Sequence, residues 1–146
     1  MGLFGGLRAL FEDRPETKDT GLDPAAIALA ALMVRLARAD DHFGDEERAA
    51  IEGALDARFG DGAALLAAGE AAERDALDHH QFTRLLKAAH EHEDRGEVLE
   101  DLWAVVLADG EREDHENALM RQIGSLLHVS DQEVQKARRR VEAARG

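Results

Sequence analysis

Four acidic residues recur as two pairs with the same internal spacing. Asp40 is followed seven residues later by Glu47, and Asp109 is followed seven residues later by Glu116. The surrounding segments, ADDHFGDEERA at 39–49 and ADGEREDHENA at 108–118, align without gaps at an offset of 69 residues (109 − 40 and 116 − 47). The four carboxylates are therefore the first candidates for chemistry, and the echo suggests an internal repeat.

Each pair falls where one predicted helix ends and the next begins. If the two halves pack about a pseudo-twofold axis, the four carboxylates converge, and an oxygen-only ligand set favours Ca²⁺, Mg²⁺ or Mn²⁺ over Zn²⁺. The alternative is that the acids cap helix N-termini and stay solvated, each stabilised by about 0.3–1 kcal/mol through the helix dipole. Capping suits Glu47 and Glu116 but not Asp40 and Asp109, because a helix C-terminus repels an acid.

An EF-hand calcium loop is excluded at both junctions. Such a loop needs Glu at position 12, where counting from Asp40 and Asp109 gives Ile51 and Met120.

The seven histidines do not favour a zinc site. Neighbours in the clusters His79-His80 and His90-Glu91-His92 point to different faces of a helix, and no H-E-x-x-H pair occurs. His42 and His115 lie inside the acidic junctions, where each is either an extra ligand or an exposed turn residue.

No motif in the sequence indicates an enzyme. Ser125 and Ser130 are the only serines, and Gly-x-Ser-x-Gly, P-loop and dinucleotide-binding motifs are absent. A metal-assisted hydrolase is the least favoured function, because it needs an open pocket beside the carboxylates. Trp103 is predicted to be a core residue and not a ligand platform.

The composition indicates a helical protein. Apolar residues make up 45% of the 146 residues but aromatic residues only 4%, and there are two prolines, so we expect a single all-α domain. The net charge of −13 repels nucleic acid and anionic membranes, so other proteins are the expected partners. The chain has no cysteine and no apolar run of about 20 residues, which favours the cytoplasm.

The chain divides into an N-terminal tail with a linker, 1–22, and a helical domain, 23–146. Residues 2–12 form an amphipathic segment that docks internally or on a partner; membrane contact is less favoured because Arg8 is its only basic residue. Residues 12–22 are charged and contain Pro and Gly, which is typical of a flexible linker.

Seven helices are predicted in the domain, and no segment favours a strand. Asp23 and Asp45 are the expected N-caps of the first two, Gly60 ends the second, and Ser130 with Glu133 forms a capping box before the last. The first helix is apolar on nearly every face, which predicts that it is buried. The expected ranges are 24–39, 45–59, 62–72, 79–90, 96–108, 114–127 and 131–144.

The motif A-D-G-x-x-x-x-x-E from Ala108 and its counterpart from Ala39 resemble the TerB-type tellurite-resistance family over about residues 23–142. The resemblance implies about seven helices with pseudo-twofold symmetry, a role in tellurite and other chemical stress, and a metal site at Asp40, Glu47, Asp109 and Glu116. Two positions depart from the family pattern, Asp41 in place of Gly and Arg112 in place of an apolar residue, so the two half-sites need not be equivalent.

The sequence therefore predicts a non-enzymatic, TerB-like module with a divalent cation as its cofactor at the two acidic junctions. The alternative is the same fold acting as a protein–protein interaction module without a metal.

Overall fold

The computed structural model describes residues 21–39, 43–76, 80–109 and 114–145, with the side chains of 109, 114–116 and 145 excepted. Seven α-helices and two short 3₁₀ helices account for nearly all of this part of the chain, and it contains no strand. The predicted all-α fold with seven helices is confirmed. The tail at 1–20 and the amphipathic segment within it lie outside the described residues.

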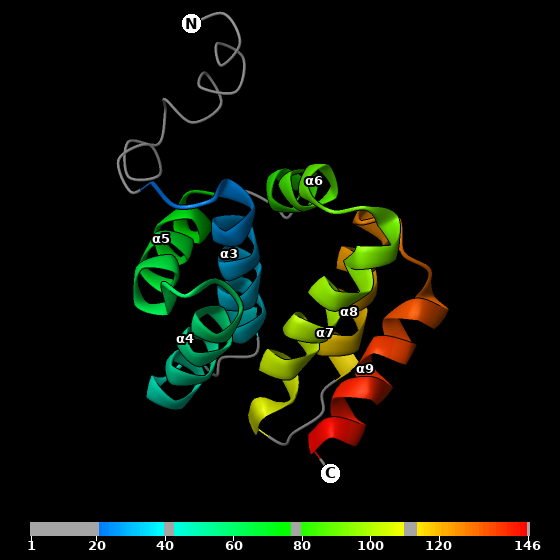
Figure 1. The fold of residues 1–146 in the computed structure, drawn as a ribbon. Helices are drawn as coiled ribbons and strands as arrows, with labels where there is room; N and C mark the ends of the chain where they lie inside the picture. The colour runs from blue at the N-terminus through cyan, green and yellow to red at the C-terminus, as the bar shows by residue number, and fades with distance from the viewer. Residues whose placement is uncertain (1–20, 40–42, 77–79, 110–113, 146) are drawn as a thin grey trace, which may run out of the picture.

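Helix α3 (Pro24–Ala39) is the central helix of the bundle. Asp23 caps it as predicted, because its Oδ1 accepts a hydrogen bond of 3.1 Å from the Ala25 N–H. Twelve of its 16 residues are buried, which confirms the expectation drawn from its apolar sequence. Figure 1 shows α3 between the α4–α5 pair and α7, with α6 across one end.

Helices α4 (Asp45–Phe59) and α5 (Gly62–Asp75) pack on one side of α3. Gly60 ends α4 in the left-handed conformation (φ +97°), as the sequence predicted. A Cβ on Gly69 of α5 would lie 2.6 Å from Ala30 Cβ of α3, so the two helices approach closely because this residue is glycine.

Helix α6 (His80–Ala89) leads through the 3₁₀ helix η1 (His92–Asp94) into α7 (Arg95–Val106). The chain tightens at the end of α7 into a second 3₁₀ helix, η2 (Leu107–Asp109). The predicted helix at 96–108 is therefore divided, and its last turn has the narrower winding that often ends helices.

Helices α8 (Asp114–Leu126) and α9 (Asp131–Arg145) complete the bundle and pack beside α7. A turn through His128 (φ +61°) separates them, and the Val129 N–H closes it on the Gly124 carbonyl at 2.8 Å. The predicted cap of α9 is present, since Ser130 Oγ accepts a hydrogen bond of 3.2 Å from the Glu133 N–H.

The core runs through both halves of the bundle, and Trp103 is its largest side chain. The Trp103 indole is buried and donates a hydrogen bond of 3.0 Å to the Val134 carbonyl of α9. Trp103 is thus a core residue, as predicted. Among the described helices, none has the length and apolar character needed to cross a membrane.

Candidate functional site

The four predicted site residues belong to two helix junctions. Among their side chains, the structure describes that of Glu47. Glu47 lies in the first turn of α4, Asp109 is the last residue of η2, and Glu116 lies in the first turn of α8. Asp40 lies outside the described residues, as do the side chains of Asp109 and Glu116. Whether the four carboxylates converge stays a prediction.

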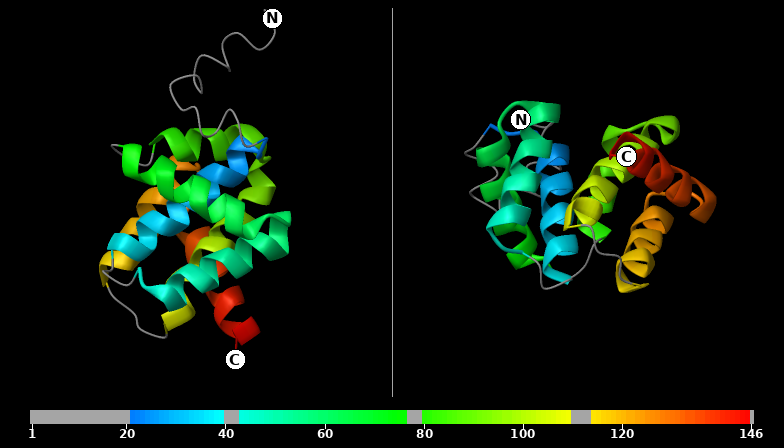
Figure 2. Two further views of the ribbon diagram at one scale, coloured as in Figure 1. Left: turned by 90° about the vertical axis from the view of Figure 1, so that its left-hand side faces the viewer. Right: turned by 90° about the horizontal axis from the view of Figure 1, so that it is seen from below.

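The helix ends that flank the two junctions lie at the same end of the bundle. In Figure 1 the C-terminus of α3, the start of α4, the end of α7 with η2, and the start of α8 all face downward, and the left panel of Figure 2 agrees. The backbone of η2 also lies against α4. Two segments 69 residues apart in the sequence (109 − 40) thus flank the same end of the molecule.

Glu47 caps the helix on which it lies. Its Oε1 accepts a hydrogen bond of 3.1 Å from the backbone N–H of Gly44, which is the N-cap of α4. The expected N-cap, Asp45, is instead the first residue of the helix. This assignment was wrong by one residue, because Glu47 satisfies the free backbone N–H of Gly44 and leaves Asp45 to the first turn.

Three acids, Asp45, Glu46 and Glu47, occupy the first turn of α4, where the helix dipole favours negative charge. Asp45 and Glu46 are exposed, whereas Glu47 is half-buried. One oxygen of Glu47 is used by the cap, and a carboxylate offers a second oxygen to another partner. The position of Glu47 therefore fits both a cap and a ligand to a hard cation.

An aromatic ring inside the first junction is in contact with two guanidinium groups. Phe43 lies under Arg38 of α3 at 5.0 Å and under Arg48 of α4 at 5.4 Å, measured from guanidinium carbon to ring centroid. Both distances are within the range of cation–π attraction. We call Arg38, Phe43 and Arg48 the arginine clamp.

Helix α5 holds both arginines of the clamp. Arg38 Nε is 3.0 Å from Glu73 Oε1, and Arg48 Nη1 is 2.6 Å from Glu70 Oε2. The hydrogen bond to Glu70 and the charge of that carboxylate raise the pKa of Arg48. The sequence analysis missed the clamp, although an aromatic residue with an arginine five residues away on each side was a visible signal.

The second junction adjoins a different arginine. Arg138 of α9 is buried, with its guanidinium carbon 5.5 Å from the Trp103 ring. Its Nη1 is 3.4 Å from Oδ1 of Asn117, the residue after Glu116. Its Nη2 is also buried and has no hydrogen-bond partner among the described residues. The start of α8 is thus tied to a cation that belongs to the core.

The family described as tellurite resistance protein TerB matches this chain over residues 26–139. This chain belongs to the TerB family. No curated protein and no solved structure matches it. The TerB match covers all seven helices in part or in whole, so both acidic junctions lie inside the TerB domain.

Elsewhere in the TerB domain, the described side chains offer no alternative metal centre. No group of three or more His, Asp or Glu residues with metal-binding geometry occurs among them. His90, which follows α6, has its Nδ1 3.1 Å from the Leu86 carbonyl of that helix. His79 and His42 lie outside the described residues, as does the side chain of His115.

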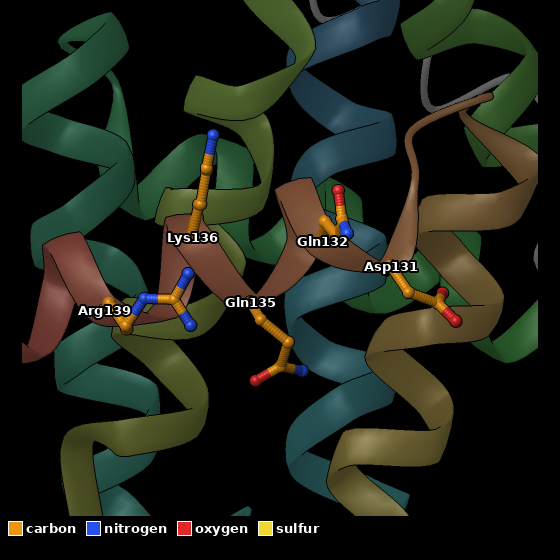
Figure 3. Close-up of a pocket in the computed structure, with 5 residues that line it drawn as sticks. All are labelled: Asp131, Gln132, Gln135, Lys136 and Arg139. Carbon is orange, nitrogen blue, oxygen red and sulfur yellow. The ribbon is translucent and has the colours of Figure 1, made fainter.

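A surface pocket lies along α9 and does not involve a described junction residue. Figure 3 shows that its lining side chains do not converge, since Lys136 and Gln135 point away from one another. Its lining residues are Asp131, Gln132, Gln135, Lys136 and Arg139.

Proposed function

We propose that this TerB-family chain is a non-enzymatic module that binds a divalent cation at its two acidic junctions and acts through partner proteins in resistance to tellurite and other chemical stress. The observation that carries the proposal is that the helix ends flanking both junctions lie at one end of the bundle, with η2 against α4. Two acidic segments on opposite sides of the molecule could not share a cation.

The donor chemistry decides the kind of cation. Asp40, Glu47, Asp109 and Glu116 offer carboxylate oxygens alone, and the chain has no cysteine. Such ligands suit Ca²⁺, Mg²⁺ and Mn²⁺ better than Zn²⁺. A bound cation would neutralise acids that otherwise repel one another at close range, and it would link the two halves of the bundle.

The alternative is a protein–protein interaction module in which the acids serve as caps and surface charge. The hydrogen bond from the Gly44 N–H to Glu47 Oε1 favours this alternative for one of the four residues. Capping does not account for Asp40 or Asp109, because the dipole repels a carboxylate at the C-terminal end of a helix.

The test is a calorimetric and thermal-shift titration of the wild type and of the Asp40→Ala, Asp109→Ala double variant with Ca²⁺, Mg²⁺, Mn²⁺ and Zn²⁺. We expect at least one of the first three cations to raise the melting temperature of the wild type, because a ligand that binds the folded state stabilises it. The double variant should lose this response. An equal response from both proteins would remove the cation and leave the interaction module.

A further inference from the structure

The arginine clamp connects the first junction to α5. Arg38 precedes the junction and Arg48 follows it, and each is paired with a different glutamate of the same helix, Glu73 and Glu70. The ring that both arginines contact belongs to Phe43, which stands between Asp40 and Glu47 in the sequence. Holding that ring restricts where Gly44 and the first turn of α4, which follow it directly, can lie.

The second junction has the acids of the first but not its clamp. At the offset of 69 residues that aligns the acids, Arg38 corresponds to Leu107, Phe43 to Arg112 and Arg48 to Asn117. Leu107 is buried and Asn117 accepts a hydrogen bond from Arg138, so both of these positions have packing roles instead. The sequence repeats the charges of the junction and not the residues that hold it.

We propose that Phe43 is a positioning residue: its ring, in contact with Arg38 and Arg48, holds the start of α4 in place, so that Glu47 binds a cation more tightly than it would without the clamp. The statement about affinity rests on the proposed function, whereas the positioning of the junction does not. A ligand site that is already ordered binds more tightly, because less conformational entropy is lost when the ligand arrives.

The experiment compares Phe43→Leu with the wild type in the full chain. Leucine keeps an apolar side chain at this half-buried position and leaves every charge in place, but it has no ring face for the guanidinium groups. Phe59→Leu is the matched control, because Phe59 is an exposed ring at the far end of α4. Phe43→Tyr keeps the ring face and should behave as the wild type does.

The first readout is amide hydrogen exchange at Gly44 without any cation, since this N–H is bound to Glu47 Oε1 beside the clamp. We expect Phe43→Leu to speed that exchange by about fivefold or more, because two cation–π contacts are lost. Exchange that is unchanged, or that Phe59→Leu speeds equally, would overturn the positioning role.

The second readout is the Mn²⁺ dissociation constant from calorimetry, which we expect Phe43→Leu to raise by about fivefold or more and Phe43→Tyr to leave unchanged. Faster exchange together with an unaltered dissociation constant would overturn the statement that the clamp tightens cation binding. A wild type that binds no cation would overturn the proposed function and the affinity statement with it, while the exchange readout would still decide the positioning role.

Discussion

The two acidic junctions carry the same charges and are supported in different ways. In the first, a half-buried ring from the junction itself is held by two arginines that α5 anchors at the surface. In the second, the ring is Trp103 of the core, and the guanidinium over it is the buried Arg138. The comparison shows that two segments with the same acidic residues can be supported by different side-chain contacts.

The largest expected effect is on the core ring of the second half. Trp103→Ala should lower the free energy of unfolding by about 3–5 kcal/mol, because it removes a large buried side chain and the hydrogen bond from its indole to the Val134 carbonyl. Chemical denaturation would measure the loss. A loss no larger than that of Phe43→Ala, whose ring is half-buried, would contradict the distinction between a core support and a surface support.

The first half depends instead on close approach between helices. Gly69→Ala should cost about 1–3 kcal/mol, because the new Cβ would lie 2.9 Å from the carbonyl carbon of Ala30 as well as 2.6 Å from its Cβ. Gly53→Ala in α4 is the matched control, since a Cβ there meets nothing within 4 Å. The control should stabilise the protein by about 0.5–1 kcal/mol, as alanine does in an open helix position. Two variants of equal stability would show that α3 and α5 are not packed as closely as described.

The smallest effect concerns an ion pair that joins the two halves, between Arg58 of α4 and Asp101 of α7 at 2.5 Å. Burial raises the pKa of Asp101, and the ion pair with Arg58 offsets this only in part. The folded state therefore binds this proton more tightly than the unfolded state does. Stability from this group is fully present below the ordinary carboxyl pKa of 3.8 and is lost as the pH rises through the higher folded value.

Asp101→Asn should remove that part of the pH dependence. Thermal melts of both proteins from acid to neutral pH would measure it. We expect the melting temperature of the wild type to fall relative to that of the variant as the pH rises. A melting temperature that instead rises relative to the variant would mean that the Arg58 pair outweighs the burial of Asp101.

The sequence predicted the helices well because their signals are local. Asp23 and Ser130 each cap the start of a helix through a hydrogen bond to a residue two or three positions on, and Gly60 ends a helix. All three do so in the structure as predicted. The predicted N-cap at Asp45 was wrong because several acids lie together at this helix start. The Glu47 side chain accepts the hydrogen bond from the Gly44 N–H, so Gly44 is the N-cap.

The supports of the junctions could not be predicted in the same way. The pairing of Arg48 with Glu70, and of Arg138 with Asn117, joins residues on different helices and depends on how those helices pack. A surface arginine in a charged segment also has the pattern of an ordinary solvated side chain. The acids were found because their spacing is repeated in the sequence, whereas their partners are not repeated.

The central claim is that the junction acids bind a cation, and Glu47→Gln tests it most directly. The amide oxygen of glutamine can still accept the hydrogen bond from the Gly44 N–H, so the cap is kept while the charge is lost. Glu133→Gln is the control, because Glu133 holds the equivalent place in the first turn of α9, away from both junctions. Calorimetric titration with Mn²⁺ should show binding weakened by about tenfold in Glu47→Gln, the loss expected for one charged ligand of about 1.4 kcal/mol, and unchanged binding in Glu133→Gln. Equal affinity in all three proteins, or no binding by the wild type, would contradict the account.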